Sequence, residues 1–296
     1  MSSVHSNAQY IPVARGSLHY HSPFPSQFID PRPIVVWLPE GYSEDQNYPV
    51  LYMHDGQMLF SFTVTKDQDD WGVDQEIDML IRLGTISDVI VVGIFNHVSL
   101  RSLEYLPQKP LKALKEKEIA ILTEHPDPFL PEIPNSQLLA DDYLRFLVYE
   151  LKPFIDRTYA TRPDRQNTFI AGSSMGGLIS WYAQCEYPNV FGGAACLSTH
   201  WTGLFRTENN PIPGRFLDYL RKNLPPPDTH RFYFDHGTED LDALYGPFQV
   251  QADQIGKEKG YTADTWLSNV FPGTGHVETD WRVQLHIPLT YFFHND

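Results

Sequence analysis

The sequence predicts an α/β fold with a mostly parallel central sheet covered by helices on both faces. Two observations carry this prediction. Short apolar runs rich in β-branched residues alternate with amphipathic segments of helical length along most of the 296 residues, which is the pattern of βαβ units. The run 88–95, DVIVVGIF, is apolar throughout, as expected of a strand buried on both faces. We expect a single domain over residues 1–296.

The individual elements follow from these runs and from the turn residues between them. Strands are predicted where β-branched and aromatic residues end at turn signals, and helices where apolar residues recur at helical spacing. Gly84 is a C-cap candidate, and an antiparallel strand or hairpin is expected within 10–33. The predicted strands are 34–39, 48–55, 88–95, 167–172, 191–198, 230–237 and 264–271, and the predicted helices are 71–84, 141–156, 174–187, 216–224, 248–260 and one from about 278.

Residues 97–139 break this alternation. The segment is rich in proline and holds only one short charged helix candidate, LKALKEKEIAIL. A loop of this length inside a compact domain is usually an active-site lid or a binding insertion. We therefore expect 97–139 to be a lid or substrate-binding insertion near the active site.

Charge and composition disfavour several kinds of partner. The formal net charge of −15 would repel nucleic acid and anionic membrane surfaces, and no run of about eighteen apolar residues is present to span a bilayer. The first residues lack the pattern of a secretory signal. Cys185 and Cys196 are too few for a disulfide framework and are expected to be buried thiols. These features favour a cytoplasmic protein, and they do not indicate an oligomeric state.

The stretch AGSSMGG, residues 171–177, follows a predicted buried strand and opens a predicted helix. A nucleophilic serine at such a turn needs small residues two positions away on either side, which gives G-x-S-x-G. Around Ser174 these neighbours are Gly172 and Gly176, whereas around Ser173 one of them would be a methionine. The pattern therefore predicts Ser174 as the nucleophile.

The base and the acid are expected to follow the serine in the order acid, then histidine. His276 lies in the loop after the last predicted strand, where a base can lean over the nucleophile. The segment FYFDHGTEDLD offers several carboxylates; Asp235 is expected still to be within its strand. We favour Asp240 as the partner of His276 Nδ1, and Asp242 stays open as the alternative.

These residues predict nucleophilic catalysis. His276 would take the proton of Ser174, and the acid would fix the imidazole tautomer and stabilise the imidazolium. The oxyanion would be bound by two backbone amides, that of Met175 after the nucleophile and that of Gln57 in HDGQMLF.

Four aromatic residues are predicted on loops at the carboxyl edge of the sheet, where α/β enzymes place ligands. They are candidates for substrate binding, with packing of the insertion as the alternative: Trp71, Tyr105, His200 and Trp201. His19 and His21 share one face of a predicted strand, but without a third ligand nearby they do not predict a metal site.

With these residues located, the chain resembles the putative-esterase branch of the α/β-hydrolases, which includes esterase D and the feruloyl and acetyl-xylan esterases. The resemblance spans about residues 33–293 and implies an acyl-serine intermediate with no metal and no organic cofactor. It is carried by VLYMHDGQMLF, WGVD, VIVVGIFN, RSLEY, ELKPFIDRTYATR, FIAGSSMGG, STHW and GHVETDW.

The residues and the resemblance together predict a serine carboxylic ester hydrolase. The expected substrates are small-molecule or carbohydrate esters with short acyl or hydroxycinnamoyl groups. Two alternatives stay open: an acyltransferase that uses the same acyl-enzyme, and a non-catalytic binding protein on the hydrolase fold.

Overall fold

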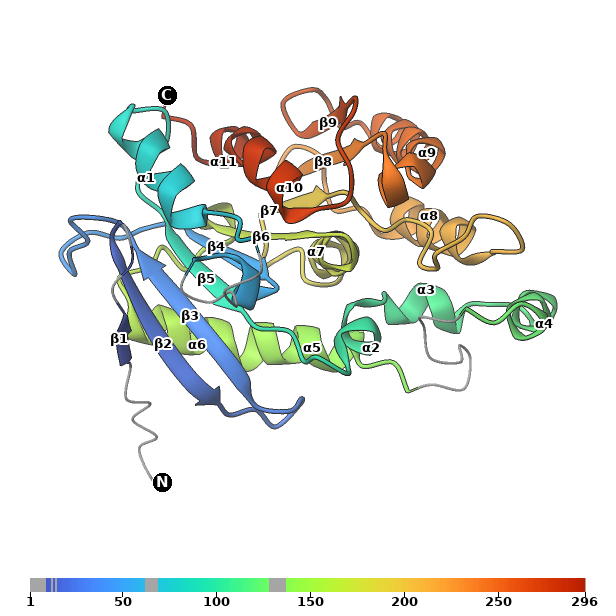
Figure 1. The fold of residues 1–296 in the computed structure, drawn as a ribbon, viewed down its shortest axis with the longest axis horizontal. Helices are drawn as coiled ribbons and strands as arrows, with labels where there is room; N and C mark the ends of the chain where they lie inside the picture. Colours follow the sequence, from blue (N-terminus) through green and yellow to red (C-terminus); the bar gives the residue numbers. More distant parts are fainter. Residues whose placement is uncertain (1–8, 12, 14, 62–68, 128–136, 296) are drawn as a thin grey trace. The chain divides into compact units, whose positions relative to one another are not determined.

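The computed structural model describes residues 9–11, 13, 15–61, 69–127 and 137–295 (Figure 1). The chain divides into two compact units. The first unit joins Met1–Val98, Arg145–Phe169 and Val277–Asp296, and the second joins Ser99–Leu144 to Ile170–His276. The expected single domain of residues 1–296 stays a prediction.

The first unit contains five strands among the described residues, in the order β1-β2-β3-β5-β4. The pairs β1–β2, β2–β3 and β3–β5 are antiparallel, and β4–β5 is parallel. The antiparallel strand or hairpin predicted within 10–33 is thereby confirmed. The strands are β1 (Gln9–Ile11), β2 (Ser17–Phe24), β3 (Arg32–Leu38), β4 (Val50–His54) and β5 (Ile90–Ile94).

Helices of the first unit depart from the predicted ones at two places. The predicted helix 141–156 contains a π-helical turn just before Pro153, which lacks the N–H that an α-helical turn needs. The predicted last helix is two helices. The elements are η1 (Gly56–Met58), α1 (Val73–Arg82), the π-helical η2 (Leu147–Leu151), α6 (Lys152–Thr158), η3 (Arg165–Asn167), α10 (Glu278–Gln284) and α11 (His286–Phe293). The helix α5 (Ala140–Phe146) leads into η2, and only its last two residues belong to the first unit.

Aromatic packing joins α6 to β2, and α6 lies behind β2 and β3 in Figure 1. The Phe154 ring is 5.1 Å from the His21 ring and 5.0 Å from the Phe24 ring. At the end of α1, Gly84 adopts φ 70°, and its amide donates to Ile81 O, as its predicted role as a C-cap requires.

The second unit holds the strands that carry the nucleophile and the other predicted catalytic groups. Their order is β6-β7-β8-β9, and β7–β8 and β8–β9 are parallel. The strands are β6 (Thr168–Ser173, of which the last four residues belong to this unit), β7 (Gly193–Leu197), β8 (Arg231–Gly237) and β9 (Trp266–Phe271). The helices are α2 (Arg101–Tyr105), α3 (Gln108–Lys112), α4 (Glu116–Glu124), α7 (Met175–Glu186), α8 (Ile212–Asn223), η4 (Asp240–Leu244) and α9 (Gly246–Glu258).

A series of buried rings forms the core of the second unit. Trp201 stacks on Trp181 of α7 at 5.8 Å between ring centroids and on Phe234 of β8 at 5.9 Å. Phe234 in turn lies 4.8 Å from Trp266 of β9. These contacts pack helix and strands together and so fix the strand ends from which the site residues project.

The described part of the 97–139 insertion is anchored on the second unit. Glu118 of α4 forms an ion pair with Arg215 of α8 at 2.7 Å, and Asp127 accepts a hydrogen bond from the Phe205 amide at 3.0 Å. Residues 128–136 lie outside the described residues. The role of the insertion as a lid stays a prediction.

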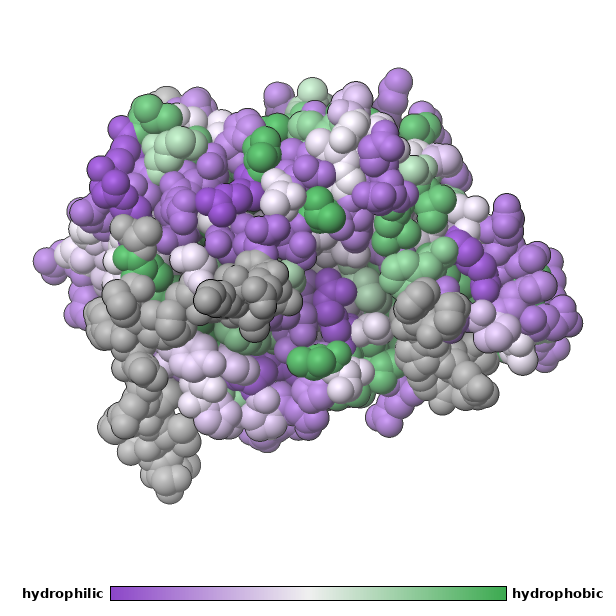
Figure 2. Space-filling model, in the orientation of Figure 1, coloured by the Kyte–Doolittle hydropathy of each residue, from purple (hydrophilic) through white to green (hydrophobic). Residues whose placement is uncertain are grey.

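Alternating strands and helices with parallel pairing confirm the predicted α/β fold class. Figure 2 shows mostly hydrophilic residues on the visible face, with hydrophobic ones scattered among them. In the described parts of the chain, no helix is long and apolar enough to cross a membrane.

Candidate active site

Ser174 occupies the turn between β6 and α7 in a backbone conformation that non-glycine residues rarely adopt. Its φ is 57° and its ψ is −121°. The Ser174 amide donates to Leu197 O at 2.9 Å, and its carbonyl accepts from the amides of Gly177 and His200 at 3.1 and 3.2 Å. Strain of this kind persists only where the surroundings fix it, and it is frequent at catalytic sites.

The glycines around Ser174 explain why this turn can form. A Cβ on Gly172 would lie 2.9 Å from the Cα of Gly176, and a Cβ on Gly177 would lie 3.0 Å from Thr199 Oγ1. Strand and helix therefore approach each other as closely as the G-x-S-x-G pattern predicts. Ser173, in contrast, is a buried residue of β6.

His276 lies after β9, and its Nδ1 is 2.6 Å from Oδ1 of Asp242. The prediction that Asp240 is the Nδ1 partner is therefore wrong. Asp240 starts the 3₁₀-helix η4 with φ 50°, and its Oδ2 faces Gly275, where an added Cβ would be 2.5 Å away. Because a 3₁₀-helix turns by about 120° per residue, side chains two positions apart point in different directions.

Asp242 is fully buried and every described contact of its carboxylate is with a donor. Its Oδ2 accepts hydrogen bonds from Ser198 Oγ and from the Gly237 amide, both at 2.6 Å. These two bonds fix the carboxylate and leave Oδ1 to His276, whose side chain is 16% exposed. The contact with Asp242 Oδ1 orients the imidazole of His276 through its Nδ1.

A second buried carboxylate, Asp235, lies within β8 as predicted. It accepts from the Ser198 amide at 2.9 Å and from Tyr233 Oη at 2.8 Å. Burial raises the pKa of Asp235 to about 7; the two hydrogen bonds oppose the shift, and the nearby Asp242 charge adds to it. Ser198 thus contacts both acids, one through its amide and one through its hydroxyl.

Tyr245 and His200 form a second hydrogen-bonded pair beside Ser174. Tyr245 Oη lies 2.7 Å from His200 Nδ1, and the Tyr245 ring centroid is 5.8 Å from that of His276. Burial, followed by the Asp242 charge, raises the pKa of Tyr245 well above its usual 10.0, while a hydrogen bond with the Ser174 side chain lowers it. Tyr245 is not among the residues predicted from the sequence. Its signal is the spacing of three from Asp242, one turn of a 3₁₀-helix.

His200 is neutral in this environment. Burial, with smaller contributions from the charges of His276 and Arg101, lowers the pKa of His200 to about 3. Its ring lies 5.2 Å from the partly exposed Phe205 ring. Within the described residues, His200 Nε2 is buried without a hydrogen-bond partner.

The two amides predicted to bind the oxyanion lie in different units. Met175 is the first residue of α7, and first-turn amides have no acceptor within their own helix. Gln57 lies in η1 of the first unit, where Asp55 adopts φ 57° and accepts from Asn96 Nδ2 at 2.6 Å. A Cβ on Gly56 would be 2.7 Å from the Gly93 carbonyl carbon, so this turn requires glycine.

Three of the four aromatic residues predicted to bind substrate are packing residues instead. Trp71 is 3% exposed and packs on Trp281 at 5.5 Å, and Tyr105 is fully buried. Trp201 is 1% exposed within the stacked core described above. The prediction failed because loop position does not reveal which rings the surrounding helices cover. His200 is also buried, but it contacts the site through Tyr245.

No group of three metal-ligating side chains occurs in the part of the chain that the structure describes. His19 and His21 instead approach the hydroxyl of Tyr159, at 3.2 and 2.7 Å. The absence of a metal site stays a prediction.

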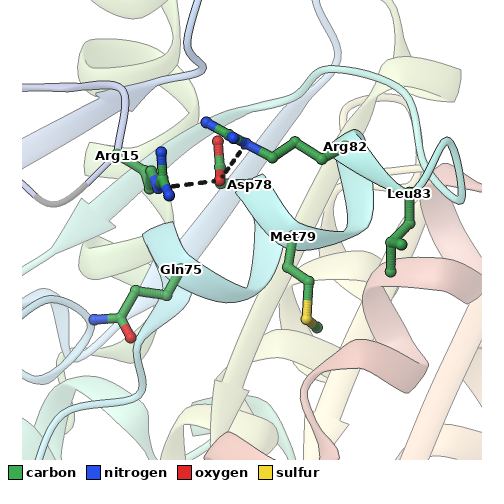
Figure 3. Close-up of a pocket in the computed structure, with 6 residues that line it drawn as sticks. All are labelled: Arg15, Gln75, Asp78, Met79, Arg82 and Leu83. Atoms are coloured by element: carbon green, nitrogen blue, oxygen red, sulfur yellow. Dashed lines mark ion pairs between the residues drawn. The ribbon is translucent and has the colours of Figure 1, made fainter.

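A separate hollow of about 570 Å³ lies on the first unit beside α1 (Figure 3). At its centre Asp78 pairs with Arg82 at 2.9 Å and with Arg15 at 3.5 Å. The hollow contains none of the catalytic candidates. Its lining residues are Arg15, Gln75, Asp78, Met79, Arg82 and Leu83.

A strained serine between strand and helix, followed in the chain by an acid and a histidine in contact, defines the class of α/β-hydrolases. The family model described as Putative esterase matches residues 26–101 and 130–291, so the chain belongs to that family. The predicted resemblance is thereby confirmed, and the predicted enzyme class, a carboxylic ester hydrolase, agrees with it.

Individual relatives are distant. The uncharacterized protein YbbA of Bacillus subtilis is 23% identical over 269 residues, covering 88% of this chain and 90% of YbbA. The ferri-bacillibactin esterase BesA of the same species is 27% identical, covering 60% of this chain and 56% of BesA. The chain spans 52%, 19% and 50% of the length of three further curated relatives.

Among solved structures, the ferulic acid esterase AmCE1/Fae1A of the anaerobic fungus Anaeromyces mucronatus is similar to this chain with a TM-score of 0.65. The two are 19% identical, and the match covers 99% of this chain and 94% of the other. This similarity confirms the α/β-hydrolase fold.

Proposed function

We propose that this protein is a serine esterase that hydrolyses carboxylic esters through an acyl-Ser174 intermediate, with His276 as base and Asp242 as acid. The observation that best supports the proposal is the 2.6 Å contact between His276 Nδ1 and Asp242 Oδ1, in the same unit as the strained Ser174. Membership of an esterase family supports the same reaction.

Acylation begins when His276 Nε2 takes the proton of Ser174 and the Oγ attacks the ester carbonyl carbon. The resulting oxyanion is bound by backbone amides, among them that of Met175. When the intermediate collapses, the bond to the alcohol oxygen breaks, and the alcohol leaves with the proton from His276. Asp242 stabilises the imidazolium that exists between these steps.

Deacylation repeats the sequence with water. His276 takes a proton from water, the hydroxide attacks the acyl carbon, and the bond from that carbon to Ser174 Oγ breaks. Oγ recovers its proton from His276, and the carboxylic acid leaves.

The proposed substrates are esters with short acyl or hydroxycinnamoyl groups, including esters on carbohydrate. The similarity to a ferulic acid esterase supports the second kind. An acyltransferase would use the same acyl-enzyme with another alcohol in place of water. Product analysis in the presence of acceptor alcohols distinguishes the two, since only a transferase forms the new ester in large excess over hydrolysis.

The test is hydrolysis of p-nitrophenyl acetate, butyrate and octanoate and of methyl ferulate by the wild type and by Ser174→Ala. We expect Ser174→Ala to lose roughly 10⁵- to 10⁶-fold in kcat with its fold intact. Ser173→Ala is the matched control, because Ser173 is the neighbouring buried residue of β6. It should keep most of the wild-type activity. Equal losses in both variants, or full activity of Ser174→Ala, would refute the assignment.

A further inference from the structure

The short segment from Leu197 to His200 contacts the backbone of the candidate nucleophile at two points. The Ser174 amide donates to Leu197 O at 2.9 Å, and the His200 amide donates to Ser174 O at 3.2 Å. The segment begins at the last residue of β7, which is the neighbour of β6, the strand that leads into Ser174. All three residues belong to the second unit. The backbone of this segment therefore fixes the turn on which Ser174 lies.

Ser198 lies between these two contacts and binds the acid of the candidate site. Its hydroxyl donates to Asp242 Oδ2 at 2.6 Å, and its amide donates to Asp235 Oδ1 at 2.9 Å. Ser198 is 1% exposed and Asp242 is fully buried, so solvent does not compete for the bond between them. One segment of four residues thus contacts both the nucleophile and the carboxylate that orients the base.

Two donors act on Asp242 Oδ2, and they connect it to different parts of the second unit. The Gly237 amide is five positions from Asp242 in the chain, so its bond is local to the loop between β8 and η4. The Ser198 hydroxyl is 44 positions away and joins η4 to the end of β7. Of these two bonds, only the one from Ser198 ties the acid to the segment that holds Ser174.

The backbone of Ser198 is strained, with a φ of 40°. Glycine adopts such a conformation without a steric cost, but it carries no hydroxyl. The conformation is imposed by the surroundings, since Asp235 accepts from the Ser198 amide and is itself held by Tyr233 Oη at 2.8 Å. Strain that the surroundings impose is frequent at functional sites. Here it directs the amide to one carboxylate and the hydroxyl to the other.

We propose that Ser198 is a positioning residue of the esterase site, which holds the acid in register with the nucleophile through its hydroxyl bond to Asp242. The inference rests on the esterase function proposed above. Asp242 transmits the effect to His276, whose Nδ1 lies 2.6 Å from Asp242 Oδ1. Without the hydroxyl, Oδ2 keeps the Gly237 amide as its donor, and the carboxylate can rotate about that single bond. His276 is then held less often in the productive orientation.

The experiment compares Ser198→Gly and Ser198→Ala with the wild type in the hydrolysis of p-nitrophenyl acetate. Both substitutions remove the hydroxyl. We expect kcat to fall roughly tenfold to hundredfold in both, the range for one lost hydrogen bond to a charged group. KM should stay unchanged, because Ser198 does not contact the substrate.

The two variants separate positioning of the acid from support of the fold. Glycine relieves the strain at φ 40°, whereas alanine keeps it, so Ser198→Gly should unfold at the higher temperature. If Ser198 only supported the fold, the glycine variant would also be the more active one. Equal losses of kcat in two variants of different thermal stability assign the loss to the hydroxyl.

Ser180→Ala is the matched control. Ser180 is a fully buried serine of α7 in the same unit, and its hydroxyl donates to Gly176 O at 2.7 Å. The substitution removes a buried hydroxyl bond of similar length that does not involve Asp242. This variant should keep the wild-type kcat.

A double variant tests whether Ser198 acts through Asp242. In the Asp242→Asn background the acid is already lost, so adding Ser198→Gly should change kcat by less than roughly twofold. If the two losses instead multiply, Ser198 acts independently of Asp242 and the proposal is refuted.

The outcomes also separate this proposal from the esterase function. A folded wild type that turns over no ester would refute the esterase function, and the role of Ser198 with it. If the wild type turns over the ester and Ser174→Ala does not, the esterase function stands. Wild-type kcat in Ser198→Gly then refutes the role of Ser198 alone, as does a loss confined to Ser198→Ala.

Discussion

The carboxylate of Asp242 lies 2.6 Å from Nδ1 of His276, and its other oxygen is bound by Ser198 Oγ and by the Gly237 amide. Asp242 is thus fixed from two sides before it contacts the imidazole. The proposed mechanism requires an acid that orients the base in this way.

Asp242→Asn should therefore lower kcat by about 10⁴-fold, because an amide favours the wrong tautomer of His276. Asp240→Asn is the matched control from the same short helix and should retain activity near the wild-type level. Steady-state kinetics with p-nitrophenyl acetate measures both. A larger loss in Asp240→Asn would contradict the assignment of Asp242.

Gly172→Ala tests the close approach of strand and helix at the serine turn. The added Cβ would lie 2.9 Å from the Cα of Gly176, so the turn must shift. We expect the free energy of unfolding to fall by about 1–3 kcal/mol and esterase activity to be lost, because the Ser174 Oγ moves with the turn.

Gly214→Ala is the control for that substitution. Gly214 lies in α8 with no atom within 4 Å of an added Cβ. Alanine there should stabilise the protein by roughly 0.5–1 kcal/mol and leave activity unchanged. Thermal unfolding and ester turnover of both variants check the pair; an active Gly172→Ala enzyme would contradict the steric argument.

Asp235→Asn should make stability less dependent on pH. Since burial raises the pKa of Asp235 from 3.8 to about 7, the folded protein holds a proton that the unfolded chain releases above about pH 4. The stability that this group contributes is therefore lost as pH rises from about 4 to 7. In the Asp235→Asn variant this decrease in stability is absent, because the asparagine side chain does not titrate.

Thermal unfolding at pH 5, 6, 7 and 8 measures the effect. The Tm of Asp235→Asn minus that of the wild type should increase across this range and level off above pH 7. A difference that is constant or decreases with pH would show that Asp235 is ionised in the folded protein throughout.

Trp201→Phe tests the finding that Trp201 packs the core. The variant loses the indole hydrogen bond to Gln249 Oε1, which is 2.8 Å long, and leaves that acceptor buried. We expect a loss of about 1–3 kcal/mol in stability with KM unchanged. Trp266→Phe, which loses a 2.8 Å bond to Asp253, should behave alike. An increase in KM for Trp201→Phe alone would instead indicate substrate contact.

The sequence by itself determined the features that depend on local backbone chemistry. Alternating apolar periodicities specify strands and helices, and the pairing of Gly172 with Gly176 requires a tight strand-to-helix turn at Ser174. The position of His276 after the last strand also follows from the local sequence pattern, because that pattern shows where the strand ends. Each of these depends on residues close together in the chain.

The tertiary structure alone decided which side chains meet. Asp240 and Asp242 carry the same side chain, so residue type does not distinguish them. The turn of η4 directs only Asp242 to His276. The same rotation brings Tyr245 onto the face of Asp242, a consequence invisible until the segment is known to be a 3₁₀-helix. Likewise, Trp201 is covered by rings from distant segments, and local sequence does not encode such contacts because burial is a property of the assembled fold.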